Sequence, residues 1–294
     1  MGSEASPVQV DIERGVARVT MNSPHNRNAL SGAMIDGLID AVEAAVADPA
    51  VRVLVLTHTG PVFCSGADLK ETAAALAGQG GPADPAAQGG PADPAAQGGS
   101  MIGGRGGAEG PGPVPAGRLG ELIATICECP KPVLARIAGP ARAGGLGLIA
   151  AADLAVCATE ASFAFTEVRV GVIPAVISAV VLPRLTPRAA AELYLTGEPF
   201  DGARAERIGL VTAAVPAAEL DAATDRYVEA LRRGAPGAMA GAKSLLLREA
   251  TATLRDDLAD LTELSIAYFG SAEGIEGMLA FREKRDPGWI SQSL

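Results

Sequence analysis

Two glycine-centred turns contain the residue types that could stabilise a developing negative charge on an oxygen atom. The first turn, residues 63–70 (FCSGADLK), follows an apolar segment typical of a strand, and the second, residues 139–145 (GPARAGG), follows another and opens a predicted helix. Glycines let a ligand oxygen approach the backbone, and the free N–H groups at a helix N-terminus can bind it. Each turn taken singly is also an ordinary strand–helix junction. Brought together, the two turns would supply two N–H donors to one oxygen, which is the geometry of an oxyanion hole.

Glu167 is a candidate acid or base because its neighbours in the segment FAFTEVR are mostly apolar. A carboxyl group in an apolar setting has a raised pKa and can exchange protons near neutral pH. The alternative is a purely structural role, in which Glu167 bonds to Arg169 or to the backbone.

Residues 145–150 (GLGLIA) also fit a variant of the dinucleotide-binding fingerprint, with Glu160 as the acid that would bind the ribose. The fit is poor, because residues 139–144 separate the preceding strand from the first glycine of the motif. Such a motif also usually opens its domain, whereas several elements precede this one. A nicotinamide-dependent dehydrogenase is therefore a minor alternative.

The composition excludes several classes of protein. The chain has 294 residues with 24 Lys and Arg against 34 Asp and Glu, and its net charge of −10 argues against a nucleic-acid partner. Its 4 Cys and 2 His form no zinc-binding pattern, and neither a metal site nor a disulfide framework is expected. With no signal-peptide pattern and no membrane-spanning stretch, the sequence predicts a soluble, cytoplasmic protein.

Strand and helix patterns alternate early in the chain, and helices dominate late. A hairpin is predicted over 8–21, strands over 51–57, 133–137, 154–157 and 211–215, and helices over 31–48, 119–127, 144–152, 177–182, 189–195 and 203–208. Nearly all of 220–281 has a helical pattern. This order predicts an α/β core with a helical C-terminal extension. Residues 78–117 form a Gly/Pro/Ala tract in which GGPADPAAQ occurs twice, typical of a flexible surface insertion, with partner binding as the alternative.

Taken together, the two turns and Glu167 resemble the crotonase family, the enoyl-CoA hydratase/isomerase superfamily. The resemblance covers most of the chain outside residues 78–117, and further family-like segments occur in the expected order. These are 22–24 (NSP), 28–30 (NAL), 129–133 (CPKPV), 171–174 (GVIP), 195–197 (LTG), 209–211 (GLV) and 281–285 (FREKR). Residues 142–148, 166–169 and 173–178 look most like a bacterial subgroup associated with methylglutaconyl-CoA hydration.

The resemblance implies a crotonase-type spiral of β-β-α units over residues 1–200 and a mostly helical oligomerisation region over 201–294. It implies a homotrimer or a dimer of trimers. It also implies an acyl-CoA substrate, of which CoA is a part, so that no separate cofactor and no metal ion are expected.

Site residues follow from the same resemblance. The N–H groups of Ala67 and Gly144 would hold the thioester oxygen, and Glu167 would exchange a proton with a substrate carbon or with water. Leu69 would lie along the adenine. The implied phosphate contacts are Arg27, Lys70 and, from a neighbouring subunit, Lys284; the other implied substrate or CoA contacts are Ala29, Ser65, Gly66, Asp68, Gly145 and Phe281.

One position departs from the well-known hydratases of this family, which carry two catalytic glutamates. The first of these lies three residues after the second oxyanion donor, where this chain has Gly147, while Glu167 fills the second position. Glycine cannot orient or deprotonate water, and family members with one glutamate include double-bond isomerases. The resemblance thus implies an enoyl-CoA hydratase, with a delta-isomerase that uses Glu167 alone, or an acyl-CoA-binding protein with little catalysis, as alternatives.

Arg142 lies two residues before the Gly144 donor, in a segment expected to line the acyl pocket. An arginine there could pair with a carboxylate at the far end of a dicarboxylic acyl chain. The alternative is an arginine at the surface or at a subunit interface.

Overall fold

The computed structural model describes residues 6–68, 71, 115–247, 272–273, 276, 280 and 283–288. The sequence predictions for the tract at 78–117, apart from its last three residues, and for most of the chain beyond residue 247 lie outside these residues.

A six-stranded sheet forms the centre of the molecule. Strands β1 (Val8–Glu13) and β2 (Val16–Met21) are an antiparallel hairpin that turns at Arg14 and Gly15, both with positive φ. Strands β3 (Val53–His58), β4 (Val133–Ile137), β6 (Leu154–Ala158) and β9 (Ala213–Val215) continue it in parallel, in the order β1-β2-β3-β4-β6-β9. The predicted strands are confirmed, with ends shifted by up to two residues.

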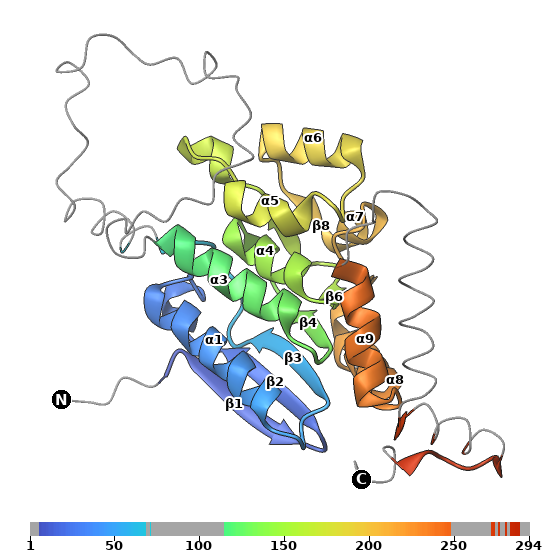
Figure 1. Ribbon diagram of the computed structural model, residues 1–294. Coiled ribbons are helices and arrows are strands. Elements are labelled where there is room, and N and C mark those ends of the chain that lie inside the picture. Colours follow the sequence, from blue (N-terminus) through green and yellow to red (C-terminus); the bar gives the residue numbers. More distant parts are fainter. Residues whose placement is uncertain are drawn as a thin grey trace, which may run out of the picture.

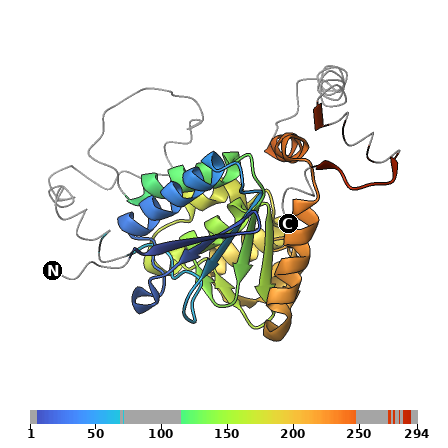
Figure 2. The same ribbon diagram turned by 90° about the horizontal axis from the view of Figure 1, so that it is seen from below.

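Helices cover both faces of this sheet (Figures 1 and 2). Helices α1 (Gly32–Ala47), α3 (Pro115–Glu128), α4 (Gly144–Ala151) and α5 (Ala175–Val181) form one layer, and α8 (Leu220–Arg232) lies against the other face. Successive apolar side chains of strand β3 point to opposite faces of the sheet, so both faces need helices packed against them. Leu54 and Leu56 enter the main core, whereas Val53 and Val55 pack with Val228 of α8.

Side-chain bonds determine where two of the helices begin or attach. Ser31 is the N-cap of α1, as the sequence predicted, because its side chain accepts a hydrogen bond from the Met34 N–H at 3.2 Å. Helix α9 (Pro236–Leu247) is anchored by Lys243, whose buried ammonium lies 2.8 Å from Asp153 and donates to the Ile126 carbonyl. No helix among the described residues is long and apolar enough to cross a membrane.

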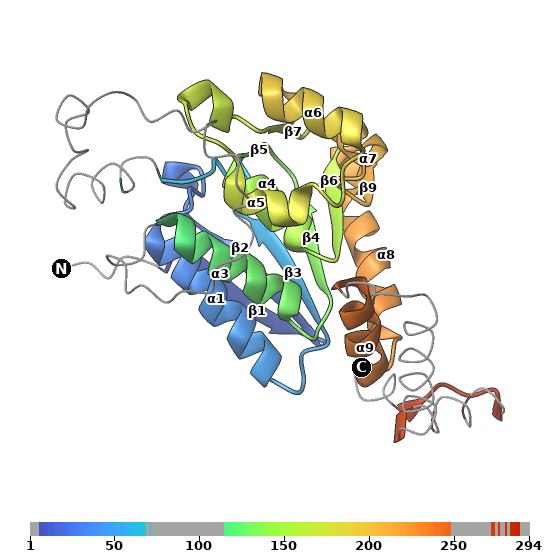
Figure 3. The same cartoon turned by 45° about the horizontal axis from the view of Figure 1, so that its top comes forward.

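A second, three-stranded sheet was not predicted. Strands β5 (Ala141–Arg142), β7 (Ser162–Ala164) and β8 (Phe200–Asp201) pair in that order. Figure 3 shows β5 and β7 between α4 and α6 (Pro187–Thr196). Strands of two or three residues have no hydrophobic period that could reveal them. The short helix α7 (Gly202–Arg207) connects β8 to β9. The two sheets therefore extend beyond residue 200, where the sequence placed the end of the core.

Candidate active site

A chain of backbone contacts joins the two glycine-centred turns. Cys64 of the first turn forms a parallel bridge with Ala141 of β5, and the Arg142 N–H donates to the Cys64 carbonyl at 2.9 Å. On the other side, Leu30 forms a parallel bridge with Ala67, and the Leu30 N–H donates to the Gly66 carbonyl at 2.8 Å. Backbone pairing, and not side-chain packing alone, therefore brings the two turns together.

The backbone of Gly66 allows this close approach. Its φ is +91°, and a Cβ added there would lie 3.0 Å from the Ala143 Cβ and 3.2 Å from the Arg142 carbonyl oxygen. A side chain at position 66 would thus be strained by its backbone conformation and would press on the second turn. Only glycine lets the two turns touch at this point.

Two N–H groups at these turns are available to a ligand. Among the described residues, neither the Ala67 N–H nor the Gly144 N–H donates a hydrogen bond to another protein group. Gly144 is the first residue of α4, where helix geometry leaves N–H groups without an intrahelical acceptor and the helix dipole adds partial positive charge. Both residues line one cavity.

Glu167 lies in the same cavity. It opens the 3-10 helix η3 (Glu167–Val170), and β7, three residues earlier, is held beside the second turn because the Ala143 N–H donates to the Ala164 carbonyl at 3.2 Å. Its side chain is buried, and its Oε2 has no hydrogen-bond partner in the described structure. Burial raises the pKa of the Glu167 carboxyl above its ordinary value, as the sequence predicted.

The proposed structural bond between Glu167 and Arg169 is not formed. Arg169 pairs with Glu198 instead, and its Nε donates to the Thr196 carbonyl at 3.0 Å. A hydrogen bond from the Glu167 backbone N–H lowers the pKa of its own carboxyl and partly opposes the effect of burial, but Oε2 has no hydrogen-bond partner among the described residues, as suits an acid or base.

The cavity measures about 290 Å³ and has an apolar wall. Helices α1, α3 and α5 and the segment before α5 supply most of this wall. Apart from Ala67, Gly144 and Glu167, its lining residues are Leu30, Ile35, Leu119, Ala143, Val172, Ile173, Pro174, Ala175, Val176 and Ile177. Glu167 is therefore the one ionisable side chain among the described residues that line it.

Ile177 fills the space beside Gly147 that a side chain at position 147 would need. A Cβ at position 147 would lie 2.5 Å from Ile177 Cγ2 and 3.3 Å from Ile123 Cδ1. Ile177 comes from α5 and is itself buried. A glutamate at position 147 has no room in this packing, so the cavity keeps a single carboxyl group.

The same packing opposes the dinucleotide alternative. Every residue of α4 is buried, and a Cβ at Gly145 would lie 2.8 Å from the Cys64 Cβ. A phosphate group would need open space at these glycines, and the fingerprint-like segment is filled by the core instead. Glu160, the residue predicted to bind ribose, is exposed.

Other predicted contacts lie on or near the first turn. Arg27 is exposed, and its carbonyl accepts the Ser65 N–H at 3.1 Å, which links its loop to this turn. Ala29 is buried, and the Asp68 N–H donates to the Leu30 carbonyl. Lys284 is exposed and does not line the cavity. The predictions for Leu69, Lys70 and Phe281 lie outside the described residues.

The guanidinium of Arg142 has hydrogen-bond partners within the protein. Its guanidinium bonds to the carbonyl and, at 3.0 Å, to the hydroxyl of Ser162, the first residue of β7. Arg142 does not line the cavity. It holds β5 to β7, because its planar fork can reach two oxygens of Ser162 at once.

Asn28 is a structural residue that the sequence analysis treated only as part of a family-like segment. It is fully buried with a φ of +52°. Its Nδ2 donates to the carbonyls of Thr59 and Val62, and its Oδ1 accepts the Ser23 N–H at 2.8 Å. The known tolerance of asparagine for left-handed backbone is the one sequence signal that could have indicated this role.

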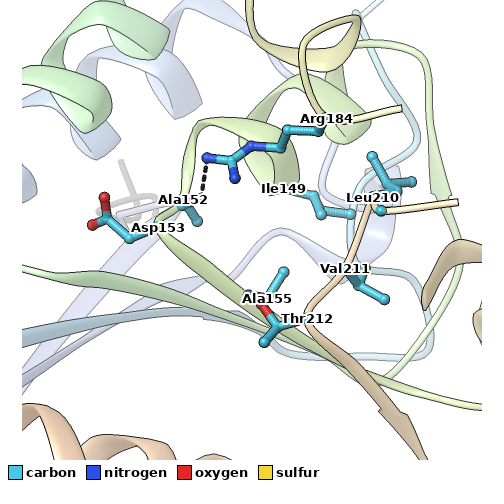
Figure 4. A pocket seen from close by; sticks show the side chains of 9 residues that line it. Ile149, Ala152, Asp153, Ala155, Arg184, Leu210, Val211 and Thr212 are labelled. Carbon is cyan, nitrogen blue, oxygen red and sulfur yellow. Dashed lines mark hydrogen bonds between the residues drawn. The ribbon is translucent and has the colours of Figure 1, made fainter. Parts of the chain in front are cut away.

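A separate small hollow of about 100 Å³ lies where α4 ends and β6 begins (Figure 4). Arg184 reaches across it and donates to the carbonyls of Ala150 at 2.5 Å and Ala152 at 3.0 Å. These bonds satisfy carbonyl groups at the C-terminus of α4, so Arg184 has a structural explanation. Among the described residues, no group of His, Cys, Asp and Glu could hold a metal ion.

Comparisons with known proteins show the family to which the chain is similar. The family model described as enoyl-CoA hydratase/isomerase matches residues 11–86 and 105–292. An enoyl-CoA hydratase from Mycobacterium avium is 40% identical, with a TM-score of 0.65, 97% of this chain covered and 100% of that chain. AtuE from Pseudomonas aeruginosa is 32% identical, with a TM-score of 0.80, 97% of this chain covered and 99% of that chain.

A curated relative extends the match to animals. The mouse protein named enoyl-CoA hydratase domain-containing protein 3, mitochondrial, is 30% identical over 98% of this chain and 86% of its own length. These solved structures share the crotonase fold that the sequence predicted. This chain therefore belongs to the enoyl-CoA hydratase/isomerase family.

Proposed function

We propose that this chain adds water reversibly to a 2-enoyl-CoA thioester through an enolate. The observation that supports this proposal is the shared cavity, in which the buried Glu167 carboxyl lies with the Ala67 and Gly144 N–H donors. Names of relatives support hydration as the reaction, since several of them are called enoyl-CoA hydratases.

The two N–H donors would act on the thioester oxygen. Addition to the β-carbon pushes electrons onto this oxygen, which becomes an enolate oxyanion. Fixed donors stabilise the enolate more than the ground-state carbonyl, because they need no reorganisation as the charge develops. Each donor would be worth about 3 kcal/mol of the barrier.

Glu167 would carry out both proton transfers. Its carboxylate takes a proton from the water whose oxygen bonds to the β-carbon, and its carboxylic acid then gives a proton to the α-carbon. The product gains H at the α-carbon and OH at the β-carbon, and Glu167 returns to its starting state. A raised pKa suits this role, because an acid and base works best when both protonation states are accessible near neutral pH.

Isomerisation of a 3-enoyl-CoA to a 2-enoyl-CoA is the second candidate, and the contact between Ile177 and Gly147 favours it. This reaction needs one carboxyl group only. Glu167 would remove a proton from the α-carbon, the same two N–H groups would stabilise the dienolate, and Glu167 would return the proton to the γ-carbon. No water has to be held in the cavity.

The two reactions are separated by the absorbance of the conjugated thioester. Crotonyl-CoA should lose this absorbance if water adds, and a 3-enoyl-CoA should gain it if the double bond moves. Glu167→Gln should abolish either change, whereas Glu160→Gln, at an exposed glutamate outside the cavity, should leave it intact.

Each outcome decides one question. Turnover of crotonyl-CoA confirms hydration, and turnover of the 3-enoyl substrate alone establishes the isomerase. Binding of acyl-CoA without either reaction would refute both and leave an acyl-CoA-binding protein.

We also infer that the chain assembles as a homotrimer or a dimer of trimers, as the family resemblance implies. Light scattering coupled to size-exclusion chromatography measures this directly, and a monomeric mass would refute it. The proposed reaction needs no cofactor apart from the CoA of the substrate.

A further inference from the structure

The cavity beside Glu167 narrows the choice of acyl group. We propose that the substrate carries a wholly apolar acyl chain of medium length, without a distal carboxylate, whose tail leaves the cavity over Val172 and Ile173. This inference rests on the proposed function, because it takes the oxyanion turns as the place of the thioester.

The wall of the cavity gives the first reason. Beyond the oxyanion donors and Glu167, the described lining consists of aliphatic side chains, proline and alanine, with Ile35, Leu119 and Val176 contributed by three different helices. An aliphatic chain gains free energy from each CH₂ group that such a wall removes from water. A carboxylate in the same place would lose its hydration without gaining a partner.

Three arginines that lie within two residues of the cavity lining in the sequence give the second reason, because each of them has another partner. Arg142 bonds to Ser162, and Arg169 pairs with Glu198. Arg118, the neighbour of the lining residue Leu119, pairs with both Asp36 and Glu121. No arginine or lysine lines the cavity among the described residues, so a dicarboxylic acyl group finds no counter-ion there.

The size and mouth of the cavity indicate the chain length. A cavity of about 150 Å³ can hold benzene, with six carbons, so the roughly 290 Å³ here would hold about twice that number of atoms. The thioester takes part of this space, which leaves room for about eight acyl carbons. At the mouth, Val172 and Ile173 are 55% and 74% exposed, and they extend the apolar surface outward.

Binding of saturated acyl-CoA thioesters tests the inference without any need for turnover. Calorimetric titration would compare butanoyl-, hexanoyl-, octanoyl- and 7-carboxyheptanoyl-CoA, of which the last two have the same chain length. Affinity should rise about fourfold per added CH₂ up to octanoyl-CoA. The carboxylated thioester should bind on the order of 100-fold more weakly than octanoyl-CoA.

A matched pair of variants locates the effect. Ile173→Arg places a cation at the mouth of the cavity. It should reduce the ratio of the affinities for octanoyl-CoA and the carboxylated thioester at least tenfold. Val170→Arg, at a residue that is 61% exposed but does not line the cavity, should leave this affinity ratio unchanged.

The results separate this inference from the proposed function. Affinity that does not depend on chain length, or equal binding of the carboxylated thioester, would overturn the inference even if Glu167-dependent turnover is observed. An affinity that rises with acyl chain length, without turnover, would support the inference and refute the proposed reaction. Absence of any acyl-CoA binding would overturn both.

Discussion

The packing of Gly147 against Ile177 allows a stability prediction with a worked magnitude. Gly147→Ala would place a Cβ 2.5 Å from Ile177 Cγ2, well inside ordinary contact distance. Overpacking of this kind costs about 2 kcal/mol, because Ile177 is buried and has no free space to enter. Alanine in a helix gains about 1 kcal/mol over glycine. The net expectation is a loss of about 1 kcal/mol in the free energy of unfolding.

Gly120→Ala is the matched control. Gly120 also lies in a helix, α3, and also faces α5, but a Cβ there would meet only Val176 Cγ1, at an ordinary 3.8 Å. The same substitution should therefore stabilise the protein by about 1 kcal/mol. Urea denaturation at one fixed protein concentration measures both differences.

A second background tests the cause. In Ile177→Ala the opposing Cγ2 is absent, so adding Gly147→Ala should raise stability instead of lowering it, with a coupling of about 1–2 kcal/mol between the two sites. The reasoning would be refuted if Gly147→Ala stabilised the protein as much as Gly120→Ala, or if the two positions showed no coupling.

Three further predictions concern single residues. Glu167→Gln should be more stable than the parent at neutral pH, because burial raises the carboxyl pKa and the ionised form destabilises the fold. In denaturation curves, the difference in the free energy of unfolding between variant and parent should grow as pH rises through that pKa and vanish well below the ordinary value of 4.5. A difference that does not depend on pH would contradict this. Asn28→Ala should lose about 3 kcal/mol in urea denaturation, from three buried hydrogen bonds of about 1 kcal/mol each, and a loss below about 1 kcal/mol would show that the loop does not depend on them. Burial raises the pKa of the Cys64 thiol to about 12, so a thiol reagent at pH 8 should modify Cys64 only after denaturation, and mass mapping that finds it labelled in the native protein would disprove its burial.

Long elements with a clear period could be predicted from the sequence. The hairpin at 8–21, the N-cap at Ser31 and the strand at 133–137 are confirmed, because hydrophobic spacing and turn residues determine them locally. The two glycine-centred turns and Glu167 could also be identified as candidate site residues, because the glycines and the apolar neighbours of Glu167 can be read directly from the sequence.

Features that depend on distant contacts could not be predicted. Strands β5, β7 and β8 have two or three residues each, and they exist only because they pair with one another. The bonds from Arg142 to Ser162 could not be predicted either, because nothing in the sequence indicates that Ser162 lies within its reach. Likewise, the sequence predicts a helix over 177–182 but cannot tell that Ile177 fills the space beside Gly147.

The chain of backbone contacts that joins the two glycine-centred turns has a consequence for the evolution of new specificities. It runs through Leu30, Ala67, Cys64, Ala141 and Ala164. The two N–H donors belong to the main chain and depend on few side chains, whereas the acyl wall is made of side chains from separate helices. Substitutions on α5 can therefore alter which acyl group is accepted while the donors stay in place. Such a division lets one lineage explore many substrates without first losing its chemistry.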